Sequence, residues 1–201
     1  MKFNTNSSFF RFMGTLFSFT GLNVLFLITC IPIFTIGPAL ASLYATTLKY
    51  IDNEDLPLVK NYWTAFRKNF KHGSLIFIIL AAVVAIIGFN IAFWRKFNSV
   101  VAQPIFIILI IVLVLIAFLT ELLFPLIGRF ENTIRQTYQN AFLIAISNFF
   151  QTLLLLAIDA SALALVYVSN FARVMFLIFG VAFVVYIKSF IVKRILTKYT
   201  A

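Results

Sequence analysis

The chain has 201 residues, of which 63% are hydrophobic, and a mean hydropathy of +1.05, so membrane spans and short connections use up nearly all of it. Its formal net charge of +10 would favour a nucleic-acid partner in a soluble protein. Here the basic residues flank apolar runs, where cationic side chains reach anionic lipid headgroups. We therefore exclude nucleic-acid binding and expect lipid contacts and one transmembrane domain over residues 1–201.

Four long stretches contain no charged residue, and they cover residues 12–48, 73–94, 97–120 and 136–158. A backbone in lipid must satisfy its own hydrogen bonds, so apolar runs of about 20 residues are typical of membrane-spanning helices. The pattern predicts an all-α, polytopic transmembrane helix bundle with five to six spanning helices and two amphipathic interfacial elbows.

The first uncharged run is 37 residues long, nearly twice what one crossing needs, and Pro32, Gly37 and Pro38 interrupt it. Proline does not continue a helix but suits the first turn of a new one. We expect a helical hairpin with one helix near 13–31, a turn at 33–37, and a second helix from Pro38 that ends before Asp52. This second helix is either a full or a re-entrant crossing. Gly37 is expected to adopt a conformation that a β-branched residue cannot reach.

The first elbow follows this hairpin. Apolar residues recur there at spacings of i, i+4, i+7 and i+11, and the cations fall largely on other faces. The apolar set is Val59, Trp63, Phe66 and Phe70, and the cations are Lys60, Arg67, Lys68 and Lys71. Two interpretations stay open, namely an interfacial anchor and a docking surface for a cytoplasmic partner.

A weak internal repeat predicts the second elbow. A shift of 68 residues aligns residues 56–59 with 124–127 and pairs Arg67 with Arg135, so the repeated units are about 38–94 and 104–168. The second elbow carries Arg129 and Arg135, and we include both in the possible docking surface.

The remaining spans are expected at 73–94, 104–124, 141–168 and 171–190. Lys and Arg accumulate in cytoplasmic loops. With six crossings and both termini inside, only Arg95, Lys96 and Arg173 of the 16 Lys and Arg residues lie outside. One crossing fewer leaves more of them outside. We therefore predict two cytoplasmic termini.

Ionisable groups within spans are costly and are candidates for function, and we count Glu121, Asp159 and Arg173. Glu121 falls near the cytoplasmic end of its helix, within reach of Arg129. Asp159 falls about 27 Å along an outward-running helix that starts near residue 141, close to the outer interface. We expect the two carboxylates to lie apart, and Asp159 to pair with Arg173.

A polar stripe accompanies Asp159, because Asn148, Thr152 and Leu155 share its helix face and Gln151 lies beside them. Such a stripe either lines a solute path or holds helices together by hydrogen bonds.

No motif for catalysis or cofactor binding is found in the sequence. His72 is the only histidine and has no ligand neighbours at metal-site spacing, and there is no phosphate-binding glycine loop. The single cysteine, Cys30, excludes an intramolecular disulfide. We expect no metal, no cofactor and no enzymatic activity.

The segments PIFTIGPA at 32–39 and ASLY at 41–44 resemble the YesL-like family of bacterial membrane proteins of unknown function, as do FRKNFK at 66–71 and FPLIGRFE at 124–131. The resemblance extends to about residue 145. It implies a bacterial cell membrane protein encoded beside carbohydrate ABC importers and sensory systems in Gram-positive bacteria, and it supplies no catalytic residues.

The leading hypothesis is a non-catalytic accessory subunit that associates with a carbohydrate ABC importer, through contacts such as those with its permease subunits, or with its sensory system. The chain lacks the cytoplasmic-loop signature of the permease subunits themselves. The alternative is an independent small-solute permease that uses the stripe as its path. A membrane enzyme is the weakest option, because no base or metal site supports it.

Overall fold

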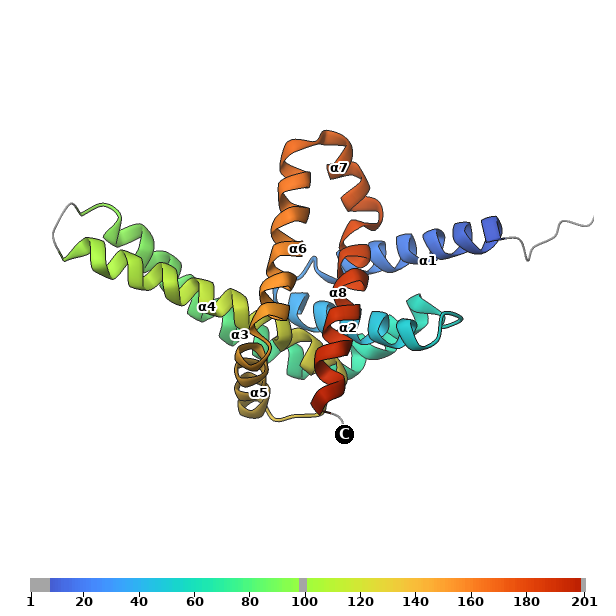
Figure 1. Cartoon of the computed structure of the whole chain (residues 1–201), viewed down its shortest axis with the longest axis horizontal. Helices are drawn as coiled ribbons and strands as arrows, with labels where there is room; N and C mark the ends of the chain where they lie inside the picture. The colour runs from blue at the N-terminus through green and yellow to red at the C-terminus, as the bar shows by residue number, and fades with distance from the viewer. Residues whose placement is uncertain (1–7, 98–100, 200–201) are drawn as a thin grey trace, which may run out of the picture.

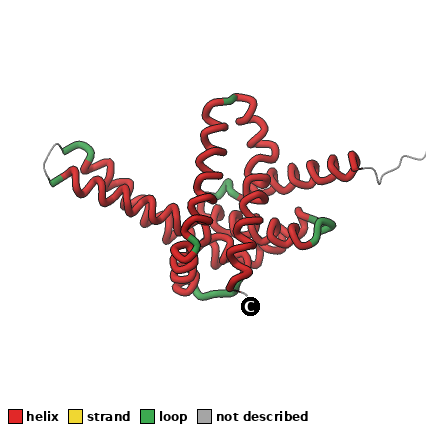
Figure 2. Tube along the Cα trace, viewed as in Figure 1, coloured by secondary structure: helices red, strands yellow, loops and turns green. Residues whose placement is uncertain are grey.

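The computed structural model describes residues 8–97 and 101–199, and within them every regular element is helical. The long helices are α1 (Ser8–Thr29), α2 (Ile36–Asp52), α3 (Leu58–Trp94), α4 (Ala102–Arg129), α5 (Ile134–Ser147), α6 (Phe149–Val168) and α8 (Val181–Leu196). The short elements are η1 (Ile33–Thr35), α7 (Asn170–Met175), the π-helical η2 (Phe176–Gly180) and η3 (Thr197–Tyr199). The predicted all-α fold is confirmed (Figure 2).

Four helical segments are long and apolar enough to cross a membrane, namely Leu58–Trp94, Ala102–Arg129, Phe149–Val168 and Asn170–Tyr199. Part of α1, Met13–Thr29, is a shorter apolar helix. The chain is therefore a polytopic helical membrane protein. Of the six expected crossings, the least span-like is α2, which has 17 residues and is surrounded by protein.

Helix α2 forms the centre of the core, and α1, α3, α4 and α8 pack around it (Figure 1). Its small residues let the neighbouring backbones approach closely, as in other packed membrane helices. A Cβ atom on Gly37 would lie 2.3 Å from the carbonyl oxygen of Gly73 in α3. On the α4 side, a Cβ atom on Gly128 would lie 2.4 Å from the carbonyl oxygen of Ala41.

The hairpin turn therefore differs from the expectation in one respect. Pro32 precedes the short helix η1, and α2 already begins at Ile36, so Gly37 and Pro38 lie in its first turn. No described glycine has a positive φ. The prediction of a special backbone conformation at Gly37 is wrong, and close helix packing is the reason that a side chain does not fit there.

Two helical hairpins diverge from this core, one made of α3 and α4 and the other of α6, α7 and α8 (Figure 1). Only 6% of the most apolar 18-residue window of α3 is buried within the chain, and the share is 11% for α4 and for α6. The outer halves of the hairpins therefore have little contact with the rest of the described protein.

Two expected helix boundaries are wrong. The first elbow is not a separate helix, because α3 runs without a break from Leu58 to Trp94 and includes both the elbow and the span. The expected span at 141–168 is instead broken at Asn148, which ends α5 and begins α6 with φ −120° and ψ 44°. Asp159 consequently lies about 15 Å into α6, and not 27 Å along a longer helix.

Candidate functional site

Three ionisable side chains from three helices meet inside the bundle. The Nζ atom of Lys188 in α8 lies 2.7 Å from Oε2 of Glu121 in α4 and 2.6 Å from Oδ2 of Asp159 in α6. The side chains of Lys188 and Glu121 are 6% and 5% exposed, whereas that of Asp159 is 39% exposed. We call these three residues the charge cluster. It joins the α3–α4 hairpin to the α6–α8 hairpin.

A cavity of about 300 Å³ lies against the charge cluster. Tyr44 of α2 and Thr120 of α4 add two hydroxyl groups near its charged end. The other walls are apolar and come from α2, α4, α6, η2 and α8, namely Leu40, Phe124, Ala162, Leu163, Phe176, Val181, Val184 and Val185. An apolar cavity with a few convergent polar groups is the usual form of a small-molecule site.

A π-helical segment precedes Lys188 and changes the register of the last span. A π-helix bonds i to i+5, which leaves backbone groups at its ends without their usual partners. Asn23 of α1 satisfies two of them, because its Nδ2 donates to the carbonyl oxygen of Leu177 at 2.7 Å and its Oδ1 accepts from the amide of Ala182 at 3.0 Å. Asn23 is fully buried. It therefore supports the register in which Lys188 points at α4 and α6.

Two expectations about the charged residues in the spans are wrong. Arg173 does not pair with Asp159, since its guanidinium donates to the carbonyl oxygens of Val166 and Tyr167 at the end of α6. The two carboxylates are not apart, since both contact Lys188.

Sequence reasoning missed Lys188, which it counted among the cytoplasmic cations. One signal could have found it. Lys188 is the only charged residue between Val174 and Val192, so it interrupts an apolar run long enough to be a span.

Asn148 and Thr152 of the polar stripe form hydrogen bonds within the protein. Asn148 accepts from Nζ of Lys198 at 2.9 Å and donates to the hydroxyl of Tyr199 at 3.0 Å, which ties the α5–α6 break to the end of the chain. Thr152 is fully buried and donates to the carbonyl oxygen of Asn148 at 3.2 Å. Gln151 has a buried Oε1 atom without a hydrogen-bond partner. These contacts favour the interpretation in which Asn148 and Thr152 hold helices together.

The first elbow presents an aromatic ladder with a cation on it. Trp63 and Phe66 stack at 5.7 Å between ring centroids, and Phe66 meets the edge of Phe70 at 5.6 Å. The guanidinium of Arg67 lies 5.1 Å from the centroid of a Trp63 ring. Phe66 is buried, but Trp63 and Phe70 remain partly exposed at 40% and 37%.

The second basic segment lies beside the first. Lys68 of α3 forms an exposed ion pair of 2.6 Å with Glu131, in the connection between α4 and α5. Arg129 lies over the ring of Phe130 at 5.9 Å. Lys71 and Arg135 are exposed. The ion pair therefore places the first elbow beside the α4–α5 connection, which lies between Arg129 and Arg135 in the sequence.

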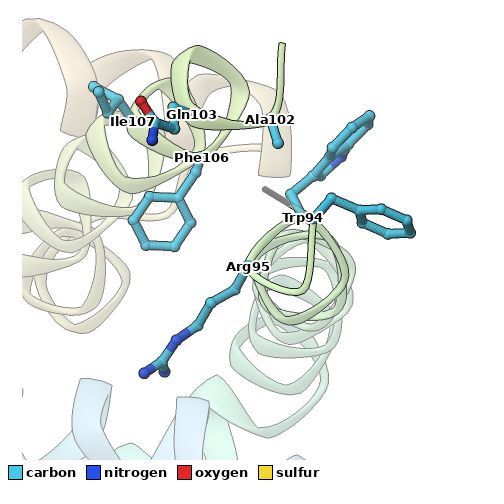
Figure 3. A pocket seen from close by; sticks show the side chains of 7 residues that line it. Trp94, Arg95, Ala102, Gln103, Phe106 and Ile107 are labelled. Carbon is cyan, nitrogen blue, oxygen red and sulfur yellow. The ribbon is translucent and has the colours of Figure 1, made fainter. Parts of the chain in front are cut away.

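Another cavity, of about 260 Å³, lies at the far end of the α3–α4 hairpin. Figure 3 shows Phe106 directed from α4 toward the space beside Arg95, while Trp94 lies on the other side of α3. Residues 98–100 are outside the described residues. We assign no site there.

Comparison with known proteins finds one match, in which residues 19–91 fit the profile of a family described as "Protein of unknown function, DUF624". No curated protein and no solved structure matches the chain. The matched segment includes the hairpin turn, all of α2 and most of α3, but none of the three residues of the charge cluster. Over this segment the chain is similar to an uncharacterised family.

Proposed function

We propose that this chain is a non-catalytic subunit of a larger membrane assembly, and that the assembly is a carbohydrate ABC importer or its sensory system. The YesL-like resemblance supports the identity of the assembly. The divergence of the two hairpins supports the existence of an assembly, and this divergence is the observation that carries the proposal (Figure 1).

An independent permease needs helices that enclose a path through both leaflets. In the described residues the two hairpins separate beyond the charge cluster. Within the protein, only 6% to 11% of an 18-residue apolar stretch is buried in each of α3, α4 and α6. Membrane helices associate through close packing and small residues. A partner subunit between the hairpins would supply the packing that this chain alone does not.

The exposed cations of the two elbows, which we call the basic face, support a cytoplasmic contact for the same assembly. Arg67, Lys68, Lys71, Arg129 and Arg135 lie on it, and Trp63 and Phe70 keep part of their rings exposed beside them. Each exposed cation contributes about 1 kcal/mol of attraction to anionic lipid. The same charges would complement acidic residues of a partner.

The test is co-expression with the permease and nucleotide-binding subunits of a carbohydrate importer from the same bacterium, followed by purification in mild detergent. We expect recovery at a fixed subunit ratio. The triple change Arg67→Gln, Lys68→Gln and Lys71→Gln should lower that recovery several-fold if the basic face docks a partner. The matched control is Arg95→Gln with Lys96→Gln at the opposite end of α3, which should leave recovery unchanged. Elution of the parent chain without importer subunits would contradict the proposal.

The second candidate is a small-solute permease, and the cavity beside the charge cluster favours it. Proteoliposomes that contain this chain alone distinguish the two candidates. The subunit proposal expects no uptake of labelled sugar above empty vesicles. Saturable uptake by the chain alone would support the permease and remove the need for partner subunits.

We also propose a bacterial cell membrane location with both termini in the cytoplasm. Cysteine at position 2, which lies outside the described residues, or in place of Lys198 should resist an impermeant thiol reagent in intact cells, in a Cys30→Ser background. Cysteine in place of Lys96 is the positive control and should react. Reaction at position 2 alone would indicate an odd number of crossings.

A further inference from the structure

The charge cluster is not electrically balanced. Glu121 and Asp159 contribute two carboxylates and Lys188 one ammonium, so the formal charge is −1 when all three are ionised. The cation nearest to Asp159 along the chain, Arg173, is engaged by two backbone carbonyl oxygens. From α2, the neighbouring polar group is the neutral hydroxyl of Tyr44. With all three groups ionised, this uncompensated charge in apolar surroundings would favour one further positive charge.

Asp159 is the carboxylate that offers a place for it. Lys188 contacts Oδ2 of Asp159 at 2.6 Å. The side chain is 39% exposed and lines the cavity, whereas Glu121 and Lys188 are almost fully enclosed. Among the three charged groups that line the cavity, Asp159 is therefore the most accessible to a cationic group that enters it.

The size and walls of the cavity indicate the rest of the ligand. Its volume of about 300 Å³ is roughly twice that of a 150 Å³ protein cavity that holds benzene. An inorganic cation would leave most of this space empty. Among the described residues, no group of three His, Cys, Asp or Glu side chains could hold a metal. An anionic solute would meet a net negative site whose only cation is already held by two carboxylates.

We propose that this cavity binds a small organic cation, with one primary ammonium group on Asp159 and a short apolar body against the walls formed by α4, α6 and α8. The ammonium group of the ligand donates hydrogen bonds to the carboxylate of Asp159. Two carboxylates and two ammonium groups then meet at the site. This inference concerns the chain alone and does not depend on the partner assembly proposed above.

The experiment is isothermal calorimetry on the purified full-length chain in mild detergent, with n-hexylammonium as the probe. We expect saturable binding in the millimolar range or tighter. Hexanoate and 1-hexanol have the same apolar body without the positive charge, and each should bind at least tenfold more weakly. Sodium chloride at equal ionic strength should neither bind measurably nor compete.

Two variants test the two halves of the site. Asp159→Asn removes the open carboxylate and leaves Lys188 on Glu121, and should weaken hexylammonium binding at least tenfold. Ala162→Phe narrows the cavity and leaves all three charges in place, and should also abolish saturable binding. The matched control is Asp52→Asn, since Asp52 is an exposed carboxylate that pairs with a lysine elsewhere, Lys193, and this change should have no effect. Unfolding curves identify variants that do not fold.

Three results would overturn the proposal. Equal binding of 1-hexanol would show a merely apolar cavity. Saturable sodium binding that displaces hexylammonium would show an inorganic cation site. If Asp159→Asn and Ala162→Phe both fold and bind hexylammonium as tightly as the parent does, the bound amine lies elsewhere on the protein or in the detergent.

Discussion

Replacement of Gly37 by alanine tests the central helix crossing. The added Cβ atom would lie 2.3 Å from the carbonyl oxygen of Gly73 and 2.5 Å from Cβ of Phe77, well inside van der Waals contact. Neither atom can rotate away, because one is backbone and the other is fixed to it, so α2 and α3 must move apart. Overpacking of this kind costs about 1 to 3 kcal/mol, and a contact with backbone belongs at the upper end. We expect Gly37→Ala to lower the free energy of unfolding by about 3 kcal/mol, roughly a hundredfold in the equilibrium constant.

The assay is reversible unfolding by sodium dodecyl sulfate in mixed micelles, followed by tryptophan fluorescence. The matched control is Gly88→Ala in α3, because a Cβ atom there meets nothing within 4 Å. Helix propensity predicts that the control is unchanged or up to about 1 kcal/mol more stable. If Gly37→Ala unfolds within about 0.5 kcal/mol of the parent, the α2–α3 approach is looser than the structure shows and the packing argument fails.

Two further predictions concern ion pairs at opposite ends of the burial scale. Lys188→Met leaves Glu121 and Asp159 without their cation and should lower the free energy of unfolding by about 3 to 5 kcal/mol. Adding Glu121→Gln and Asp159→Asn should restore most of this loss. If Lys188→Met alone is as stable as the parent in the same unfolding assay, the buried cluster is contradicted. Lys68 lowers the pKa of the exposed Glu131 carboxyl through a hydrogen bond and its charge. Lys68→Gln should therefore return that pKa to its ordinary range, as measured by NMR titration. Identical titration curves for the variant and the parent would refute the contact. Because the folded-state pKa is the lower one, the small stabilisation is present above the ordinary carboxyl pKa and is lost as pH falls through the lowered value.

The membrane class and the all-helical fold were predictable because they depend on local properties of the chain. Long uncharged runs must satisfy their backbone hydrogen bonds internally, whatever the helices pack against. The interruption at Pro32 also marked a true break between helices, because proline restricts its own backbone and that of its neighbour. Pro125, by contrast, does not end its helix, since α4 continues through it to Arg129.

The charge cluster was decided by the tertiary structure alone. Asn148 looked like one more residue of a continuous span, and its break shortens the distance from the helix start to Asp159 and turns α6 toward α4 and α8. The π-helical register before Lys188 is supported by Asn23, 159 residues from the amide that it binds, so no local pattern could predict it. Sequence spacing fixes which residues share a face of one helix, whereas the pairing of charges depends on where helices break and how they cross. That is why the residue types of the site were visible in the sequence and their partners were not.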